Sequence, residues 1–434
     1  MRKRMAGLLG LLTLGVAACG ELTPTSVDPK LLPEEPVTVE VRVPWDQFGS
    51  DLASFGGFGS PHDLGRGVVA HEFGGSLEAR TLVALAALPT SATVRDTTGT
   101  QVTDDSLRVL QGRMMAVVDT LGSVADGPVT LQIGMVSQAW DPGSATWEAA
   151  VDSLGDTQAW TEAGGGPVSN TLTAVWDPAQ GDTAVFDLDS AQVALWTDTA
   201  STNQGVRLEA LSPGSRLSVR GLLLQADVQP SVNPDTTVVV TATSSNVTFL
   251  YTPAPPPPDG SIRVGGTPSW RTVLDVAVPT TLTGPAELCD AVGCPLTLTA
   301  DQVSYAALVL RTQRSDPAFR PSDSVRVDVR PVFDRTVLPK SPLGSSLLSI
   351  LGLRFAPELF DSGEGSEVEI PVTSFVRQLL SADTTSAFPP PNTLALLSTF
   401  EPLSLSYASF YGPGTPEAPV LKLIVTSGPA VELP

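Results

Sequence analysis

The sequence predicts an all-β protein with two tandem jelly-roll-like antiparallel β-sandwich domains, each carrying one short helix. Three observations lead to this fold class. Glycine (38 residues) and proline (39 residues) are frequent in the 434-residue chain, as expected for many short strands joined by turns. Strand-like segments recur between turn clusters without the strand–helix alternation of a parallel sheet. The order of these segments repeats after a proline-rich stretch, which indicates two copies of one unit.

Residues 1–18 have the pattern of an export signal. Arg2, Lys3 and Arg4 form a positive segment, the apolar run that follows is too short for a stable membrane-spanning helix, and small residues lead to Cys19. A cysteine at this place resembles the lipobox of bacterial lipoproteins, which implies cleavage before Cys19 and lipid attachment to that residue. An ordinary signal peptide with an incidental cysteine is the alternative.

Residues 19–36 follow as a lipidated tether that is rich in proline and has little periodicity. No second apolar run reaches the length of a membrane-spanning helix, so the lipid is the expected contact with a membrane. Glycine, not aspartate, follows Cys19. By resemblance to the sorting of lipoproteins in diderm bacteria, this favours the outer membrane or cell surface, facing an oxidising compartment.

Residues 37–245 are expected to form the first β-sandwich module. The segment 37–45 alternates apolar and polar residues, as a half-buried strand does. Residues 79–89 are an almost continuous apolar run that ends in proline, which fits either a buried strand or a short helix.

Residues 246–260 contain four consecutive prolines and are expected to form a stiff junction, because no sheet interior accepts such a run. Residues 261–430 then repeat the features of the first module and form the second one. For example, residues 270–279 match residues 79–89 in carrying Arg-Thr, an apolar run and a closing proline.

One segment in each module breaks the β pattern. In the first, Asp189 or Ser190 caps a short predicted helix that carries Val193 and Trp196 on one face. Residues 368–380 occupy the same place in the second module. Each sandwich is therefore expected to carry a single short helix.

Several of these motifs together resemble a known family. They are an Arg-x-Leu-type strand that ends in Leu-Pro, the element Trp140 to Trp147 with Thr146, a Phe-Asp-Leu helix and a closing strand. In this order they resemble DNRLRE-type (disaggregatase-related) jelly-roll modules, which are grouped with carbohydrate-binding modules. The resemblance implies carbohydrate binding. The second module lacks the Trp-Thr-Trp element, and neither module contains a DNRLRE-like string.

The cysteines have separate expected roles. Cys19 takes the lipid, which leaves Cys289 and Cys294. In an exported protein, two cysteines this close in sequence are expected to form a local disulfide. A metal site would need further Cys or His ligands nearby, and the sequence offers none.

Charge and motif content argue against several function classes. The formal charge of −21 repels phosphate backbones, so nucleic acid is not an expected partner. We expect no enzymatic activity and assign no catalytic residue, since the chain has only two histidines and no G-x-S-x-G or H-E-x-x-H motif. No cofactor or metal is assigned. Acidic pairs leave open a structural calcium ion at a strand end: Asp104 with Asp105, Asp187 with Asp189, and Glu367 with Glu369.

Tryptophans mark the candidate ligand site. Trp147, Trp160 and Trp176 lie in one segment rich in glycine, aspartate and proline. Sugar rings stack on aromatic faces while neighbouring polar side chains bind their hydroxyl groups. The alternative is that these rings fill the open end of the sandwich as core.

The sequence therefore predicts a non-enzymatic, lipid-anchored cell-envelope protein that binds polysaccharide. A structural or scaffolding lipoprotein that binds an envelope protein is the alternative. A hydrolase that uses paired carboxylates is a third interpretation.

Overall fold

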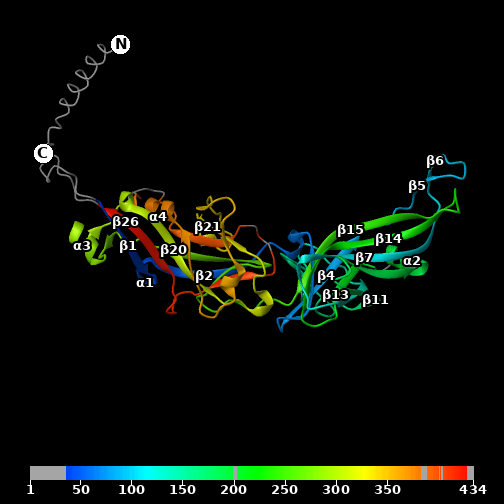
Figure 1. Ribbon diagram of the computed structural model, residues 1–434, viewed down its shortest axis with the longest axis horizontal. Coiled ribbons are helices and arrows are strands. Elements are labelled where there is room, and N and C mark those ends of the chain that lie inside the picture. Colours follow the sequence, from blue (N-terminus) through cyan, green and yellow to red (C-terminus); the bar gives the residue numbers. More distant parts are fainter. Residues whose placement is uncertain (1–35, 199–202, 383–388, 400, 402–403, 428–434) are drawn as a thin grey trace, which may run out of the picture.

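The computed structural model describes residues 36–198, 203–382, 389–399, 401 and 404–427 (Figure 1). The signal segment, Cys19 and nearly all of the tether lie outside the described residues. Within the described part, no helix is long and apolar enough to cross a membrane.

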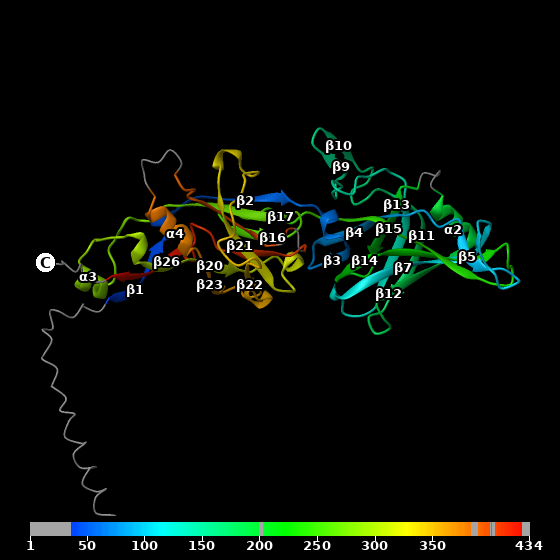
Figure 2. The same ribbon diagram turned by 90° about the horizontal axis from the view of Figure 1, so that it is seen from above.

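The chain forms two β-sandwiches arranged end to end (Figures 1 and 2). The first sandwich comprises residues 61–251. Its strands are β3 (Gly67–Phe73), β4 (Leu77–Leu85), β7 (Leu107–Val124), β8 (Val129–Val136), β11 (Val168–Trp176), β12 (Thr183–Asp189), β13 (Gly205–Ala210), β14 (Ser215–Pro230) and β15 (Val238–Tyr251). Two hairpins project from it: β5 (Ala92–Arg95) with β6 (Gln101–Asp104), and β9 (Ala149–Ser153) with β10 (Asp156–Ala159).

The strands of the first sandwich form two antiparallel layers. One layer has the order β11-β8-β13-β4, and the other has the order β12-β7-β14, with β3 beside β14. Strand β15 belongs to both, because its first half pairs with β14 and its second half pairs with β4. Apolar side chains from both layers, including Met114, Ile133, Phe186 and Leu208, meet in one core.

The second sandwich comprises residues 37–58 and 262–427. Its strands are β1 (Val37–Pro44), β2 (Gly49–Phe58), β16 (Ile262–Gly265), β17 (Ser269–Val276), β18 (Thr281–Leu282), β19 (Leu296–Thr297), β20 (Val303–Gln313), β21 (Val325–Val332), β22 (Leu353–Phe355), β23 (Glu367–Pro371), β24 (Thr393–Ser398), β25 (Tyr407–Phe410) and β26 (Val420–Ser427). Two helices follow strands: α1 (Trp45–Phe48) and α4 (Thr373–Leu380). Helix α3 (Ala286–Val292) lies between β18 and β19.

The expected repeat is visible in the sheet topology. The layer β22-β21-β24-β17 of the second sandwich has the same order as β11-β8-β13-β4 of the first. On the other layer, β23 pairs with β20 as β12 pairs with β7. The all-β class and the antiparallel sandwich arrangement are therefore confirmed.

The first two strands differ from the expected module boundary. Residues 37–58 do not join the first sandwich: β1 pairs with β26 along its whole length, and β2 pairs with β17. Val41, Val43 and Phe48 are buried in the core of the second sandwich. Alternation in the sequence specifies which face of a strand is buried, but it does not specify the sheet that covers that face.

The N-terminal strands take the place in the second sandwich that β15 takes in the first. Strand β15 passes from β14 to β4, and β1 and β2 pass in the same direction from β26 to β17. Each sandwich therefore has a crossing strand. In the first sandwich the crossing strand is β15, at the C-terminal end of that sandwich. In the second it is formed by β1 and β2, at the start of the described chain.

The end of the first module also differs from the expected residue 245. Strand β15 continues to Tyr251, because residues 246–251 pair with β4 and bury Phe249 and Leu250. The proline-rich junction is consequently confined to residues 252–261, between β15 and β16. Residues 79–89, which allowed a strand or a helix, supply β4, a strand inside the layer.

The two predicted short helices are present, but the expectation of a single helix in each sandwich is wrong for the second, which carries α1, α3 and α4. Helix α2 (Ser190–Thr197) begins after Asp189, whose side chain accepts a hydrogen bond from the Gln192 backbone N–H. Val193 and Trp196 point into the first core, as their spacing predicts. Helix α4 follows β23 in the second sandwich as α2 follows β12 in the first.

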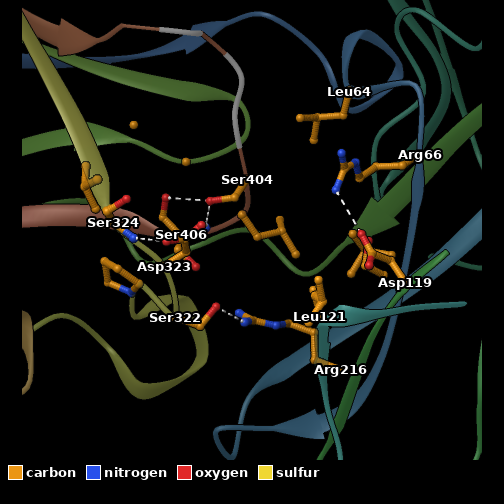
Figure 3. A pocket seen from close by; sticks show the side chains of 18 of the residues that line it. Leu64, Arg66, Asp119, Leu121, Arg216, Ser322, Asp323, Ser324, Ser404 and Ser406 are labelled. Atoms are coloured by element: carbon orange, nitrogen blue, oxygen red, sulfur yellow. Dashed lines mark hydrogen bonds and ion pairs between the residues drawn. The ribbon is translucent and has the colours of Figure 1, made fainter. Parts of the chain in front are cut away.

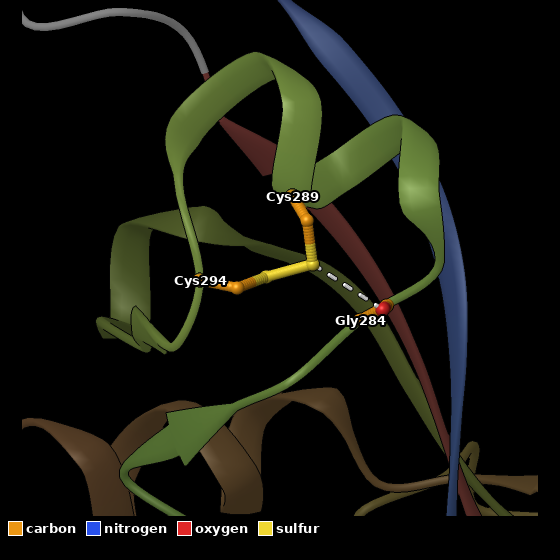
Figure 4. Close-up of a disulfide and its surroundings, with 3 residues drawn as sticks. All are labelled: Gly284, Cys289 and Cys294. Atoms are coloured by element: carbon orange, nitrogen blue, oxygen red, sulfur yellow. Dashed lines mark hydrogen bonds between the residues drawn. A yellow bond between two sulfur atoms is a disulfide. The ribbon is translucent and has the colours of Figure 1, made fainter.

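The predicted disulfide is confirmed as well. Cys289 lies in α3 and is bonded to Cys294 in the turn that follows the helix (Figure 4). The bond joins the short helix to the segment that enters β19, at the end of the second sandwich where β1 begins (Figure 1).

Candidate functional site

The three candidate tryptophans do not form one exposed surface. Trp176 ends β11 and is 2% exposed within the main core of the first sandwich. Trp160 is 6% exposed, and its indole N–H donates to the Thr146 carbonyl at 2.9 Å. Neither ring has a free face for a sugar, so the assignment of Trp160 and Trp176 as ligand-binding residues is wrong. Trp147 is half-buried beside Trp160.

Buried charges bind the tryptophan segment to the sheet beneath it. Arg80 on β4 donates to the Gly164 carbonyl at 2.9 Å and lies 5.1 Å from the centre of the Trp147 ring. Glu209 on β13 pairs with Arg80 at 3.0 Å and with Arg207 at 3.1 Å. Burial is the main cause that lowers the pKa of Arg80, and neighbouring Arg207 adds to it. This cluster holds the segment in place.

Three consecutive glycines allow this close packing. Gly164, Gly165 and Gly166 all have positive φ angles. A Cβ atom on Gly164 would lie 2.7 Å from Arg80 Nη1 and 2.9 Å from the Trp147 ring. The aromatic segment is therefore a packed cover on the outer face of the layer β8-β13-β4: Leu82 and Val136 contact Trp147 and Trp160, whereas the adjacent Val83 and Met135 belong to the main core on the opposite face. These two rings are packed, but they do not fill an open end of the sandwich.

At least one carboxylate of each acidic pair accepts hydrogen bonds from the protein itself. Asp104 accepts a backbone hydrogen bond from Ser106 at 2.9 Å, the main cause that lowers its pKa. Asp189 caps α2, and Glu369 accepts from the Lys422 ammonium at 2.9 Å. Among the described residues, no group of three or more His, Cys, Asp or Glu side chains is placed to hold a metal ion.

A polar cleft lies between the two sandwiches (Figure 3). Its volume of about 450 Å³ falls in the range of small-molecule sites, roughly 300–1,000 Å³. The first sandwich contributes the charged side chains Arg66, Asp119 and Arg216 together with Leu121. The second contributes Asp323 and a group of hydroxyl side chains: Ser322, Ser324, Ser398, Ser404 and Ser406.

An apolar cluster beside the cleft joins the two sandwiches. We call it the junction cluster; it contains Ala70, Leu77, Ala79 and Phe249 from the first sandwich, and Ala318, Phe319, Leu405 and Tyr407 from the second. Phe319 stacks on Tyr407 with ring centres 5.8 Å apart. Gly74 has a φ of 60°, and a Cβ there would lie 2.5 Å from the backbone nitrogen of Ala318. Close backbone approach and buried apolar contact fix the relative position of the cleft walls.

Arg216 is the central charged group of the cleft. It lies in β14 opposite Ala70 of β3, is 7% exposed, and has its guanidinium 4.8 Å from the centre of the Phe73 ring. Its Nη2 donates across the cleft to Ser322 Oγ at 3.1 Å. Burial lowers the pKa of Arg216, although an arginine stays protonated at neutral pH.

The other cation of the cleft is already paired. Arg66 lies 3.8 Å from Asp119, which also pairs with Arg220 at 3.2 Å. In contrast, no carboxylate of the described residues lies within ion-pairing distance of Arg216. The cleft thus presents one positive charge that lacks a protein counter-ion.

This cleft could hardly be predicted from the sequence. Its walls come from segments more than 100 residues apart, such as Arg216 and Ser322. Arg216 does stand in a run of consecutively buried positions, Ser215 to Val219, where a charge is unusual. In the sequence, however, Arg216 takes a polar position in a segment that alternates polar and apolar residues, so no local signal identified the site.

Comparison with known proteins does not assign the chain to a family. No family model matches it, and no curated protein matches it. Among solved structures, a chain described as BspA_C_WT is similar at 10% identity with a TM-score of 0.15, over 77% of this chain and 99% of that one. A TM-score this low carries no information on function. Membership of the DNRLRE-type family stays a prediction.

Proposed function

We propose that this protein is a non-catalytic, lipid-anchored cell-envelope protein that binds polysaccharide in the cleft between its two sandwiches. The observation that carries the proposal is the hydroxyl-rich cleft, whose walls come from two sandwiches packed through the junction cluster. Because the walls of a preformed cleft are already ordered, binding costs less conformational entropy of the protein.

The composition of the cleft supports a hydroxylated ligand. Serine side chains both donate and accept hydrogen bonds, and the carboxylate of Asp323 is an acceptor for sugar hydroxyl groups. Leu121 is 96% exposed at the cleft and offers an apolar surface to the C–H face of a sugar ring. An exposed large apolar side chain beside polar groups is a feature of binding surfaces.

The path of the chain supports a position of the cleft away from the membrane. Strand β1 enters the second sandwich at Val37, which pairs with Ser427 at the end opposite the first sandwich (Figure 1). A lipid on Cys19 would therefore hold the second sandwich near the membrane. The first sandwich and the cleft would then face outward, where a long-chain glycan is accessible.

The test compares two variants of the full chain on an array of bacterial and environmental polysaccharides. Ser322→Trp fills the cleft from an exposed position, and Trp147→Ala removes the half-buried ring of the aromatic segment. We expect the unchanged protein and Trp147→Ala to bind the same glycans and Ser322→Trp to lose them. Both variants are first checked for unchanged thermal unfolding.

Two results contradict the proposal in different ways. Loss of binding in Trp147→Ala alone would move the site back to the aromatic segment. Absence of any glycan signal, together with a stable protein partner recovered from the envelope, would favour the scaffolding interpretation.

A further inference from the structure

Arg216 has no negatively charged partner in the described part of the cleft. It is 7% exposed as a residue, its guanidinium lies against the Phe73 ring, and its one side-chain hydrogen bond among the described residues goes to the neutral oxygen of Ser322. Its remaining N–H groups have no protein acceptor in the part of the chain that the structure describes, and none of these atoms is fully buried, so they are open to the cleft. A bound anion would supply the missing partner.

The charges around Arg216 limit the charge of that anion. Arg66 is paired with Asp119, so Arg216 is the one arginine of the described cleft lining without an ion pair, and the lining as a whole, with two arginines and two aspartates, carries no net positive charge. Asp119 and Asp323 place two carboxylates along the same walls. A dianion such as a phosphate monoester would meet more repulsion than attraction here, whereas a monoanion would be balanced by Arg216.

The arrangement of donors favours a tetrahedral anion. Ser322 Oγ accepts from Arg216, which leaves the hydroxyl proton free to donate into the cleft. Ser324 and Ser406 add hydroxyl groups from the second sandwich, whereas the Ser404 hydroxyl is bonded to the Ser406 backbone (Figure 3). Donors from several directions suit the three terminal oxygens of a sulfate ester better than the planar pair of a carboxylate.

We infer that the cleft recognises a sulfate ester group on a polysaccharide, with Arg216 as the charge-bearing contact. This inference rests on the proposed function and names the ligand class of the same site. The overall charge of −21 repels a polyanion such as a sulfated polysaccharide at long range, as it repels a phosphate backbone. At physiological ionic strength this charge is screened beyond about 8 Å, so selectivity comes from the contact with Arg216.

The experiment measures dissociation constants of the full chain for matched polysaccharides at about 0.15 M salt. The probes are chondroitin sulfate against unsulfated chondroitin, and dextran sulfate against dextran. Unsulfated chondroitin keeps its carboxylates, so a difference in affinity between the two forms of chondroitin is due to the sulfate group. We expect sulfated forms to bind about 10- to 100-fold more tightly, which corresponds to one charge-assisted contact.

Two matched variants separate a specific contact from general attraction. Arg216→Gln should remove the preference for sulfated forms, while Arg220→Gln, which changes the net charge equally on the same strand β14 but outside the cleft lining, should keep it. If both variants lose affinity alike, binding is non-specific charge attraction and the inference is wrong. If Arg216→Gln weakens sulfated and unsulfated forms equally, Arg216 acts only as a structural bridge to Ser322.

The outcomes also separate this inference from the proposed function. Equal binding of sulfated and unsulfated polysaccharides, abolished by Ser322→Trp, would overturn the sulfate inference and leave the polysaccharide site intact. Preference for unsulfated chondroitin over dextran would point to a carboxylate and also overturn it. No binding to any polysaccharide would contradict both.

Discussion

Replacing Phe48 with alanine tests which sandwich the N-terminal strands complete. Phe48 is 1% exposed, and it packs in the core that also contains Leu274, Leu308 and Leu423. Loss of a buried phenylalanine ring typically costs about 3–5 kcal/mol. For a domain of roughly 150–250 residues this lowers the unfolding temperature by about 6–20 °C. The second sandwich should therefore unfold earlier while the first stays unchanged.

Hydrogen exchange resolved by peptide is the suitable assay, because the two sandwiches need not unfold as one cooperative unit. Phe48→Ala should lose protection in β17, β20 and β26 and keep it in β4, β8 and β13. The matched control is Phe186→Ala, also 1% exposed, in the core of the first sandwich. It should produce the opposite pattern. If Phe48→Ala exposes the strands of residues 61–251 instead, the assignment of β1 and β2 is wrong.

Three further predictions concern single residues. Cys19→Ala should move the protein from membrane to soluble fractions after cell lysis; retention in the membrane would contradict the lipid anchor. Trp160→Ala should lower the free energy of unfolding of the first sandwich by about 3–5 kcal/mol in denaturant titration, because a buried ring is removed, and an unchanged value would show that the ring is dispensable. Hydrogen bonds, chiefly from the Ser106 backbone N–H, lower the pKa of Asp104. The ionised carboxylate therefore stabilises the folded state at pH values above the ordinary pKa of 3.8, and this stabilisation is lost as the pH falls through the lowered pKa. With Asp104→Asn, the free energy of unfolding should accordingly fall less steeply as the pH is lowered. The same pH dependence in the variant and the unchanged protein would contradict this role.

Local features of the fold could be predicted from the sequence because neighbouring residues determine them. Asp189 caps α2 through a hydrogen bond to Gln192, three residues away. Cys289 and Cys294 are close enough in sequence to meet in one turn. The proline run near residue 255 cannot enter a sheet, so it had to be a junction.

The candidate site was only partly predictable. The tryptophan-rich composition of one segment singled out the aromatic segment of the first sandwich. Composition alone does not distinguish a packed cover from an open groove. The glycines at 164–166 decide it, since they let Arg80 and the Trp147 ring approach the backbone. The cleft itself had no continuous signal, because its walls come from distant segments.

The sequence by itself determined the strand periodicity, the capped helices, the local disulfide and the existence of two related units. Only the tertiary structure decided that β1 and β2 close the second sandwich, and that Arg216 faces Ser322 across a cleft. The physical reason is the same in both cases. Periodicity specifies which face of a strand avoids water, whereas the partner that covers the face is selected by packing over the whole chain.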